Sequence, residues 1–135
     1  MTKLYLLDTN IASYAIKGSS PAVQRRIERV PMAQLAISAV TERELLYGVA
    51  RRPEATLLHA IVNEFLLRVS VQPWDSNVAR HYGTLWAALE TQGRPIGNLD
   101  MMIGAHALAL GAVLVTNDQA FSRIKGLKIE NWLRA

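Results

Sequence analysis

Short apolar runs alternate with longer segments of helical periodicity along most of this chain. Residues 4–7, 35–37 and 112–115 are apolar without interruption, as expected of strands that are buried on both faces. Residues 69–71 and 127–129 are weaker strand candidates. Because short strands that alternate with helices pair in parallel, the pattern predicts an α/β fold, namely a three-layer α/β/α sandwich with a mostly parallel central sheet.

The segments between these runs carry residues that begin and end helices. Asp8, Thr9 and Asn10 predict a helix that Gly18 stops, and Pro21 suits the first turn of the next helix. Apolar residues recur at three- and four-residue spacing in four further segments, which we expect to be helices: residues 42–50, 54–68, 76–92 and 99–110. Ser38 and Thr41 are candidate caps of the first of these four helices, and Asn98 is a candidate cap of the last.

The composition narrows the class of protein. The chain of 135 residues, 50% hydrophobic and 19% charged, suits one folded domain over residues 1–135. The absence of cysteine excludes disulfides, thiolate nucleophiles and cysteine-bound zinc, and it favours a reducing, cytoplasmic compartment. Since the longest run of apolar residues and glycine, residues 107–115, falls well below the ~18 residues of a membrane span, we expect a soluble protein.

Four acidic residues lie at predicted strand ends or helix starts. Asp8 directly follows the first strand, Asp118 follows the strand over 112–115, Glu44 follows the second strand, and Asp100 lies in the first turn of a helix. Ligands of open parallel sheets bind beyond the carboxyl ends of the strands. If the four carboxylates converge there, their repulsion requires a cation, and oxygen ligands favour Mg²⁺ or Mn²⁺ over zinc. The pattern therefore indicates metal-dependent chemistry on phosphoryl groups.

Each acid also has a purely structural interpretation. Asp8 can cap a helix, and Thr41-x-x-Glu44 fits a capping box in which Glu44 only bonds a backbone amide. Asp100 can complement a helix dipole, and Asp118 can stabilise a turn. The occurrence of all four at such positions favours a common site.

The motifs around these acids resemble the PIN-domain ribonucleases, most closely the VapC toxins of bacterial toxin–antitoxin pairs. The match is collinear over nearly the whole chain and rests on four segments: Leu6-Leu7-Asp8-Thr9-Asn10, Ile37-Ser38-Ala39-Val40-Thr41-x-x-Glu44-Leu45-x-x-Gly48, Gly93-Arg94-Pro95-Ile96-Gly97-x-x-Asp100 and Val115-Thr116-Asn117-Asp118-x-x-Phe121.

The resemblance implies that Asp8, Glu44, Asp100 and Asp118 form the catalytic, metal-binding site. Glu44 rather than Glu42 matches the motif. The fourth acid varies most in the family, so Asp118 either binds metal directly or acts through water. Further polar residues in the motifs are expected to bond the ligands or water, or to cap helices: Thr9, Asn10, Ser38, Thr116 and Asn117.

The resemblance also implies an activity and partners. It predicts a PIN-like fold and a Mg²⁺-dependent endoribonuclease toxin that cuts structured RNA, with tRNA and its anticodon region as the expected target. A cognate VapB-type antitoxin would neutralise it, and the toxin is expected to form a homodimer and larger toxin–antitoxin complexes. Helical apolar stripes that include Tyr82 and Trp86 are the physical support for such interfaces.

The charge suits an anionic partner. There are 15 basic residues against 11 acidic ones, and against 7 once the four site acids are set aside. Candidate RNA contacts are Arg25, Arg26 and Arg29 on one predicted helix, and Arg94 in the loop before Asp100. The alternative for the three helical arginines is a solvated face, and for Arg94 an ion pair that holds its loop.

Two other functions remain open on the sequence. A haloacid-dehalogenase-like phosphatase also begins with an aspartate after its first strand, but this chain has Asn10 where a second aspartate is usual. A non-catalytic RNA- or protein-binding module would use the acids only as caps. The three histidines, His59, His81 and His106, lie in predicted helices and are expected to have core or surface roles.

Overall fold

A parallel sheet of five short strands forms the centre of the molecule. The computed structural model describes residues 3–134. The strands are ordered β3-β2-β1-β4-β5, and each neighbouring pair is parallel. They are β1 (Tyr5–Leu7), β2 (Leu35–Ser38), β3 (Ser70–Gln72), β4 (Val113–Val115) and β5 (Lys128–Glu130). All five predicted strands are confirmed, with bounds shifted by at most one residue at each end.

The helices also follow the predicted order. They are α1 (Thr9–Lys17), α2 (Pro21–Arg29), α3 (Ala39–Ala50), α4 (Thr56–Arg68), α5 (Ser76–Thr91) and α6 (Asn98–Leu110). Two short 3₁₀ helices, η1 (Met32–Gln34) and η2 (Gln119–Arg123), were not predicted. A single 3₁₀ turn is too short to show a hydrophobic period, so the sequence carries little signal for it.

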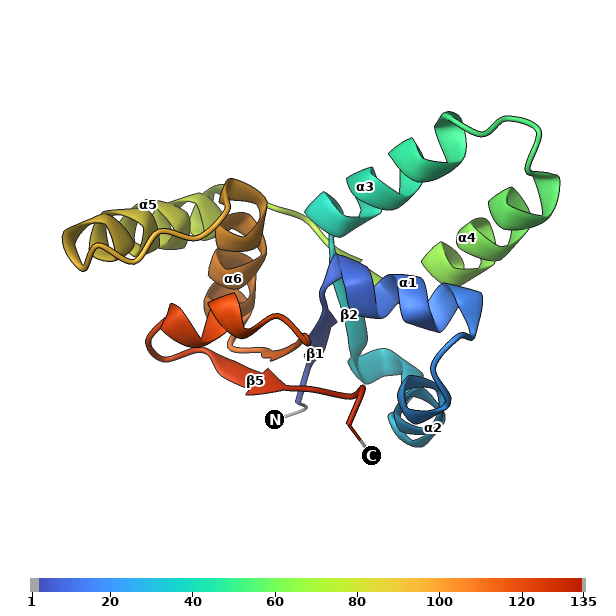
Figure 1. Ribbon diagram of the computed structural model, residues 1–135, viewed down its shortest axis with the longest axis horizontal. Coiled ribbons are helices and arrows are strands. Elements are labelled where there is room, and N and C mark those ends of the chain that lie inside the picture. The colour runs from blue at the N-terminus through green and yellow to red at the C-terminus, as the bar shows by residue number, and fades with distance from the viewer. Residues whose placement is uncertain (1–2, 135) are drawn as a thin grey trace.

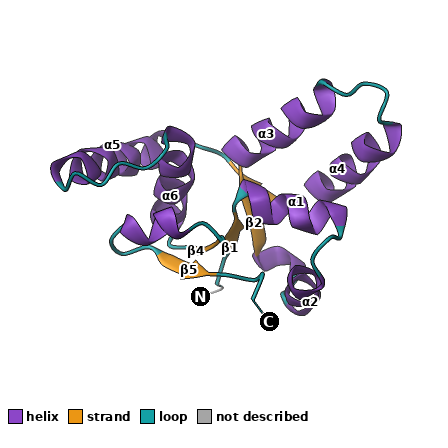
Figure 2. Cartoon of the chain, viewed as in Figure 1, coloured by secondary structure: helices purple, strands orange, loops and turns teal. Residues whose placement is uncertain are grey.

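The helices cover both faces of the sheet, as Figures 1 and 2 show. One core lies between the sheet and α5 and α6, and the other lies between the sheet and α1, α2 and α4. Helix α3 extends from the end of β2 and contributes to both cores. The architecture is the predicted three-layer α/β/α sandwich.

The strands supply the two cores by simple alternation. Leu6 of β1 and Leu114 of β4 face the α5–α6 core, whereas Leu7 and Val115 face the opposite core. These four side chains have no exposed surface. Burial on both sides explains why β1 and β4 are uninterrupted apolar runs in the sequence.

Three predicted helix starts are wrong, among them that of α4, which begins at Thr56 rather than at residue 54. Helix α3 begins at Ala39 rather than at residue 42, because Ser38 is its N-cap and accepts a hydrogen bond from the Val40 amide. Thr41 lies inside the helix and caps nothing. Helix α6 begins at Asn98, and the N-cap position belongs to Gly97.

The topology fixes where a ligand can bind. Strand β1 is central and pairs with β2 on one side and β4 on the other. The carboxyl ends of these strands lie at one edge, where α1 and α3 begin. That edge is the expected position of a site in a parallel sheet. None of the helices in residues 3–134 is long and apolar enough to cross a membrane.

Candidate active site

Asp8 lies between the sheet and helix α1 and is only 5% exposed. It is the N-cap of α1, and its Oδ1 accepts a hydrogen bond from the Ile11 amide at 2.9 Å. Its Oδ2 accepts a hydrogen bond from the Thr116 hydroxyl at the end of β4. The structural interpretation of Asp8 as a cap is therefore correct, but the same carboxylate also lines a cavity with three other acids.

That cavity has a volume of about 320 Å³ and lies at the carboxyl edge of the sheet. We call it the acidic cavity. It is lined by the four predicted site acids together with two polar and two apolar neighbours: Asp8, Glu44, Asp100, Asp118, Thr9, Asn10, Leu99 and Ile103. Residues more than 100 positions apart in the sequence thus meet at one site.

The acids affect one another's protonation. Burial is the main cause that raises the pKa of Asp8, and the charges of Asp100 and Asp118 raise it further, while the bonds from Thr116 and Ile11 act in the opposite direction. The pKa of Asp100 is raised by burial and by Asp118 beside it. The cluster is electrostatically unfavourable as long as no cation offsets its charge.

Glu44 enters the cavity from helix α3. The capping box Thr41-x-x-Glu44 is wrong, because Ser38 caps this helix. The Thr41 side chain is fully buried and lies 3.1 Å from the Thr9 hydroxyl on α1. This contact ties the two helices together beside the cavity, so Glu44, one turn further along α3, faces the acids instead of the helix end.

Asp118 is held by its own loop. Its Oδ1 accepts a hydrogen bond from the Ala120 amide at 2.9 Å, and its amide donates to the Thr116 hydroxyl oxygen at 3.0 Å. Thr116 thereby connects Asp118 and Asp8 through one hydroxyl group. The turn role predicted for Asp118 is present, and its carboxylate still lines the acidic cavity.

The other predicted polar residues separate into two groups. Thr9 and Asn10 line the cavity, and Thr116 bonds Asp8 directly. Ser38 does not line the cavity; it caps α3 and bonds the buried His106. Asn117 is exposed outside the acidic cavity, and its Oδ1 accepts from the side chain of Asn131 at 2.7 Å.

The donor set fits a hard divalent cation. Among residues 3–134, no three Asp, Glu or His side chains form a ready cage for a metal ion. Mg²⁺ does not require one, because it usually keeps several waters and binds through one or two carboxylates. Carboxylate oxygens suit Mg²⁺ or Mn²⁺, and no cysteine or histidine at the cavity favours zinc.

The four candidate RNA-binding arginines lie outside the acidic cavity. Arg25 and Arg29 are exposed on α2. Arg26 bonds Glu130 at 2.8 Å, and its guanidinium stands 4.9 Å from the centre of the Trp132 ring. Arg94 is exposed, and within the described chain no carboxylate lies within 4 Å of it. The alternative role of Arg94, an ion pair that holds its loop, is therefore not supported by the contacts within residues 3–134.

Leu99 and Ile103 complete the cavity wall and were not predicted. They lie on α6 next to Asp100 and one turn beyond it, so helical spacing from Asp100 is the signal that identifies them. His106 was assigned a core or surface role, which its full burial confirms as a core role. Its bond to Ser38 joins residues 68 positions apart, which no local pattern reveals.

Comparison with known proteins identifies the fold. Residues 5–127 match the family model of the PIN domain. The chain is 38% identical over 131 residues to the tRNA(fMet)-specific endonuclease VapC of Shigella flexneri, with 95% of this chain and 97% of the relative covered.

Two solved structures agree with this match. The structure of VapBC2 from Rickettsia felis bound to a DNA fragment from their promoter has a TM-score of 0.86 at 36% identity and covers 96% of this chain and 98% of that one. The DNA-bound VapBC from Salmonella typhimurium has a TM-score of 0.89 at 34% identity and covers 97% of this chain and 99% of that one. The chain therefore belongs to the PIN-domain family, within which its relatives are the VapC ribonucleases.

Proposed function

We propose that this protein is a metal-dependent endoribonuclease, the toxin of a toxin–antitoxin pair, built as one PIN-like nuclease domain over residues 1–135. One observation carries the proposal. Four carboxylates, from the β1–α1 junction, α3, α6 and the loop between β4 and η2, line a single cavity at the carboxyl edge of the sheet, in a chain whose relatives are named ribonucleases.

Asp8, Asp100, Glu44 and Asp118 are the residues that would hold the cation, for which we propose Mg²⁺, with Mn²⁺ as a substitute. When bound, such an ion lowers the pKa of water and stabilises charge on a phosphodiester. The protein keeps two of the carboxylates in place: Thr116 and the Ile11 amide orient Asp8, and the Ala120 amide orients Asp118. Burial, with a further contribution from neighbouring carboxylate charge, raises the pKa of Asp8 and of Asp100, and a bound cation would offset the repulsion between these charges.

The names of the relatives support tRNA as substrate. Two VapC relatives, from Shigella flexneri and Salmonella typhimurium, are named tRNA(fMet)-specific endonucleases. We infer that this chain cuts structured RNA, most directly tRNA in its anticodon region. Arg94 and the α2 arginines are the proposed backbone contacts, although the ion pair of Arg26 with Glu130 favours a structural role for that residue.

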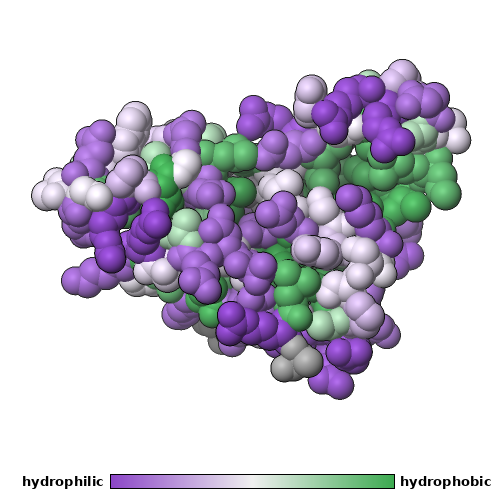
Figure 3. Space-filling view, in the orientation of Figure 1, coloured by the Kyte–Doolittle hydropathy of each residue, from purple (hydrophilic) through white to green (hydrophobic). Residues whose placement is uncertain are grey.

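Uncovered apolar surface supports protein partners. Large apolar side chains of α3 and α4 are exposed, among them Tyr47 (63%), Leu57 (73%) and Leu67 (82%), and Figure 3 shows apolar residues gathered over these helices. Trp86 on α5 is also 46% exposed. Since similar structures are VapBC complexes, we propose a homodimer that binds a VapB-type antitoxin in the cytoplasm.

The two alternatives differ in their support. The PIN-domain match argues against a haloacid-dehalogenase-like phosphatase. A non-catalytic binding module would keep the fold and lack only the activity, so a cleavage experiment is needed to distinguish it from the enzyme.

The test uses purified protein and tRNA with Mg²⁺ or with excess chelator. The wild type should cleave only with the metal. Asp100→Asn should reduce cleavage by at least about 10³-fold, because metal-assisted charge stabilisation contributes several kcal/mol. Asp75→Asn is the matched control: Asp75 caps α5 through the Val78 amide and does not line the acidic cavity.

Sequencing of RNA 5′ ends after brief induction in cells would identify the bond that is cut. Full cleavage in chelator, or an active Asp100→Asn variant, would contradict the proposed mechanism. A folded wild type that cuts no RNA in the presence of Mg²⁺ would support the binding module.

A further inference from the structure

A second hollow adjoins the acidic cavity. It has a volume of about 530 Å³ and lies between α1 and the segment that follows β4. Its polar lining includes Asn10, Ser13, Tyr14, Lys17, Asn117 and Asp118. Asn10 and Asp118 line both spaces, so the hollow continues directly from the acids. We call it the α1 groove.

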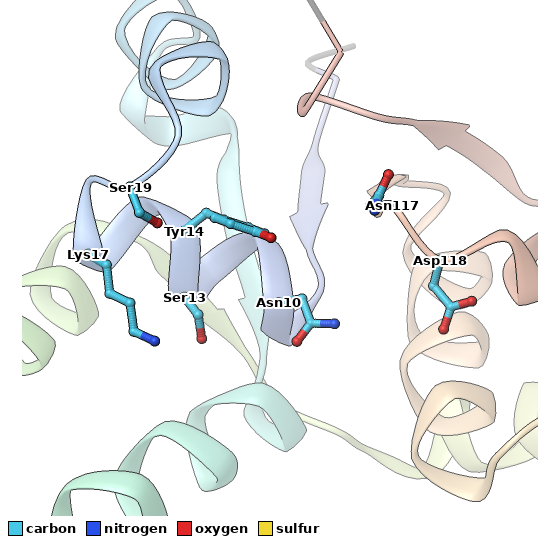
Figure 4. A pocket seen from close by; sticks show the side chains of 7 residues that line it. All are labelled: Asn10, Ser13, Tyr14, Lys17, Ser19, Asn117 and Asp118. Carbon is cyan, nitrogen blue, oxygen red and sulfur yellow. The ribbon is translucent and has the colours of Figure 1, made fainter.

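Helix α1 forms one long wall of the groove. Asn10, Ser13, Tyr14 and Lys17 are three, four and seven residues apart, a spacing that places them on one stripe of a helix. Figure 4 shows these side chains along α1, with Asn117 and Asp118 across the hollow on the segment after β4. At ~1.5 Å per residue, the stripe extends about 10 Å from Asn10 to Lys17.

The chemistry of the lining changes along this path. Its inner end carries the Asp118 carboxylate and its outer end carries Lys17. Within residues 3–134, no carboxylate lies within 4 Å of the Lys17 ammonium, whose side chain is exposed. Hydroxyl and amide groups of Ser13, Asn10 and Asn117 lie between the two charges. Such a lining suits a ligand that is anionic and rich in hydrogen-bond acceptors.

Tyr14 adds a flat aromatic surface to the same wall. It is 36% exposed, and aromatic side chains at this degree of exposure can stack on an unpaired base. An ammonium group that contacts phosphate next to an aromatic ring is a common combination in proteins that bind single-stranded nucleic acid.

We propose that the α1 groove binds the single-stranded RNA segment next to the scissile phosphate. Lys17 contacts a phosphate beyond the one that is cut, because it lies about two helical turns from the acids, and the Tyr14 ring supports a base. This inference rests on the proposed ribonuclease function and adds to it the direction in which the substrate strand leaves the acidic cavity.

The test compares Lys17→Ala with Lys128→Ala, which removes the same charge elsewhere. Lys128 pairs with Val113, the first residue of β4, and so lies at the opposite edge of the sheet from the acids. Affinity for unfractionated tRNA is measured against salt concentration with each substitution in an Asp100→Asn background, so that the RNA stays intact. Cleavage of tRNA is measured separately with Asp100 present.

Lys17→Ala should weaken tRNA binding about three- to tenfold and reduce the slope of log affinity against log salt by about 0.7, the value for one phosphate of a single strand. Lys17→Arg should restore both, and Lys128→Ala should change neither. Tyr14→Phe should bind as the wild type does, and Tyr14→Leu should lose about fivefold or more.

The outcomes separate this inference from the function on which it rests. Cleavage of tRNA by the wild type decides the ribonuclease function. If the wild type cleaves tRNA and Lys17→Ala behaves as Lys128→Ala does, the α1 groove does not carry the strand. Lys17→Ala could instead lower the melting temperature while leaving tRNA affinity and its salt slope unchanged, with Lys17→Arg melting as the wild type does. That result would assign Lys17 a structural role at the end of α1 and would also overturn the inference.

Discussion

The hydrogen bond between Ser38 and His106 connects the two helices that carry Glu44 and Asp100. The Ser38 hydroxyl lies 2.8 Å from Nδ1 of His106, and its oxygen also accepts from the Val40 amide at 3.0 Å. Both side chains are fully buried. Burial is the main cause that lowers the pKa of His106, so the ring is neutral at physiological pH.

Ser38→Ala removes both the N-cap of α3 and the hydrogen-bond partner of His106, and the free-energy costs of the two losses add. Loss of a serine N-cap costs about 1 kcal/mol. Nδ1 of His106 then lacks a partner in a fully buried position, which costs about 1–3 kcal/mol more. Nε2 of this ring already has no hydrogen-bond partner in good geometry within residues 3–134. We expect Ser38→Ala to lower the free energy of unfolding by roughly 2–4 kcal/mol.

Two further variants isolate the contribution of His106. Ser20→Ala removes only a cap, because Ser20 accepts from the Val23 amide at the start of α2 and makes no other side-chain bond in the described chain; it should cost about 1 kcal/mol. His106→Leu replaces the ring by an apolar group of similar size and should change stability by less than about 1 kcal/mol. In the double variant Ser38→Ala/His106→Leu no buried ring nitrogen is left without its partner, and only the helix cap is lost. The free energy of unfolding of the double variant should therefore be only about 1 kcal/mol below that of the wild type.

Urea unfolding at a single protein concentration measures these differences. For a slope near 2 kcal/mol/M, Ser38→Ala should shift the midpoint by about 1–2 M and Ser20→Ala by about 0.5 M. If the costs of Ser38→Ala and His106→Leu simply add within about 0.5 kcal/mol, the two residues are not coupled and the reasoning fails. Equal costs for Ser38→Ala and Ser20→Ala would contradict it as well.

Three other outcomes follow from the contacts of single side chains. The folded state raises the pKa of Asp100 above its ordinary value of 3.8, so this carboxyl favours folding below pH 3.8 and opposes folding as the pH rises through the raised pKa. In chelator near neutral pH, Asp100→Asn should therefore melt at a higher temperature than the wild type, and this difference should disappear towards about pH 4. Equal melting temperatures at every pH would refute this prediction. Arg26→Ala should cost about 1 kcal/mol through the lost contacts with Glu130 and Trp132, whereas Arg25→Ala, at an exposed position of the same helix, should cost almost nothing in a thermal melt. Arg94→Ala should leave the melting temperature unchanged, since no carboxylate of the described chain lies within 4 Å of Arg94. The same variant should reduce the salt dependence of tRNA binding by about one phosphate contact, and an unchanged slope of log affinity against log salt would show that Arg94 does not contact the RNA.

The sequence by itself determined the order and positions of the strands and main helices. These elements depend on local features, namely uninterrupted apolar runs for buried strands and residues such as Asp8, Gly18 and Gly111 at helix ends. The motifs around the four acids also sufficed to indicate the PIN-domain family, which the comparison of residues 5–127 confirms.

Tertiary structure decided which of several local interpretations applies. Thr41 and Ser38 are both good caps by residue type, and the contact of Thr41 with Thr9, 32 residues away, places Thr41 inside α3 and leaves the cap to Ser38. From the sequence, Arg26 cannot be told apart from a solvated surface arginine. Only the fold places it beside Glu130, 104 residues later in the chain.

The same reason explains why the sequence did not reveal the bond between Ser38 and His106 or the α1 groove. Both arise where segments far apart in the chain are brought together by the sheet, and their geometry depends on the packing of whole helices. A local pattern specifies which side of a helix is polar, but only the packed structure specifies what that side faces.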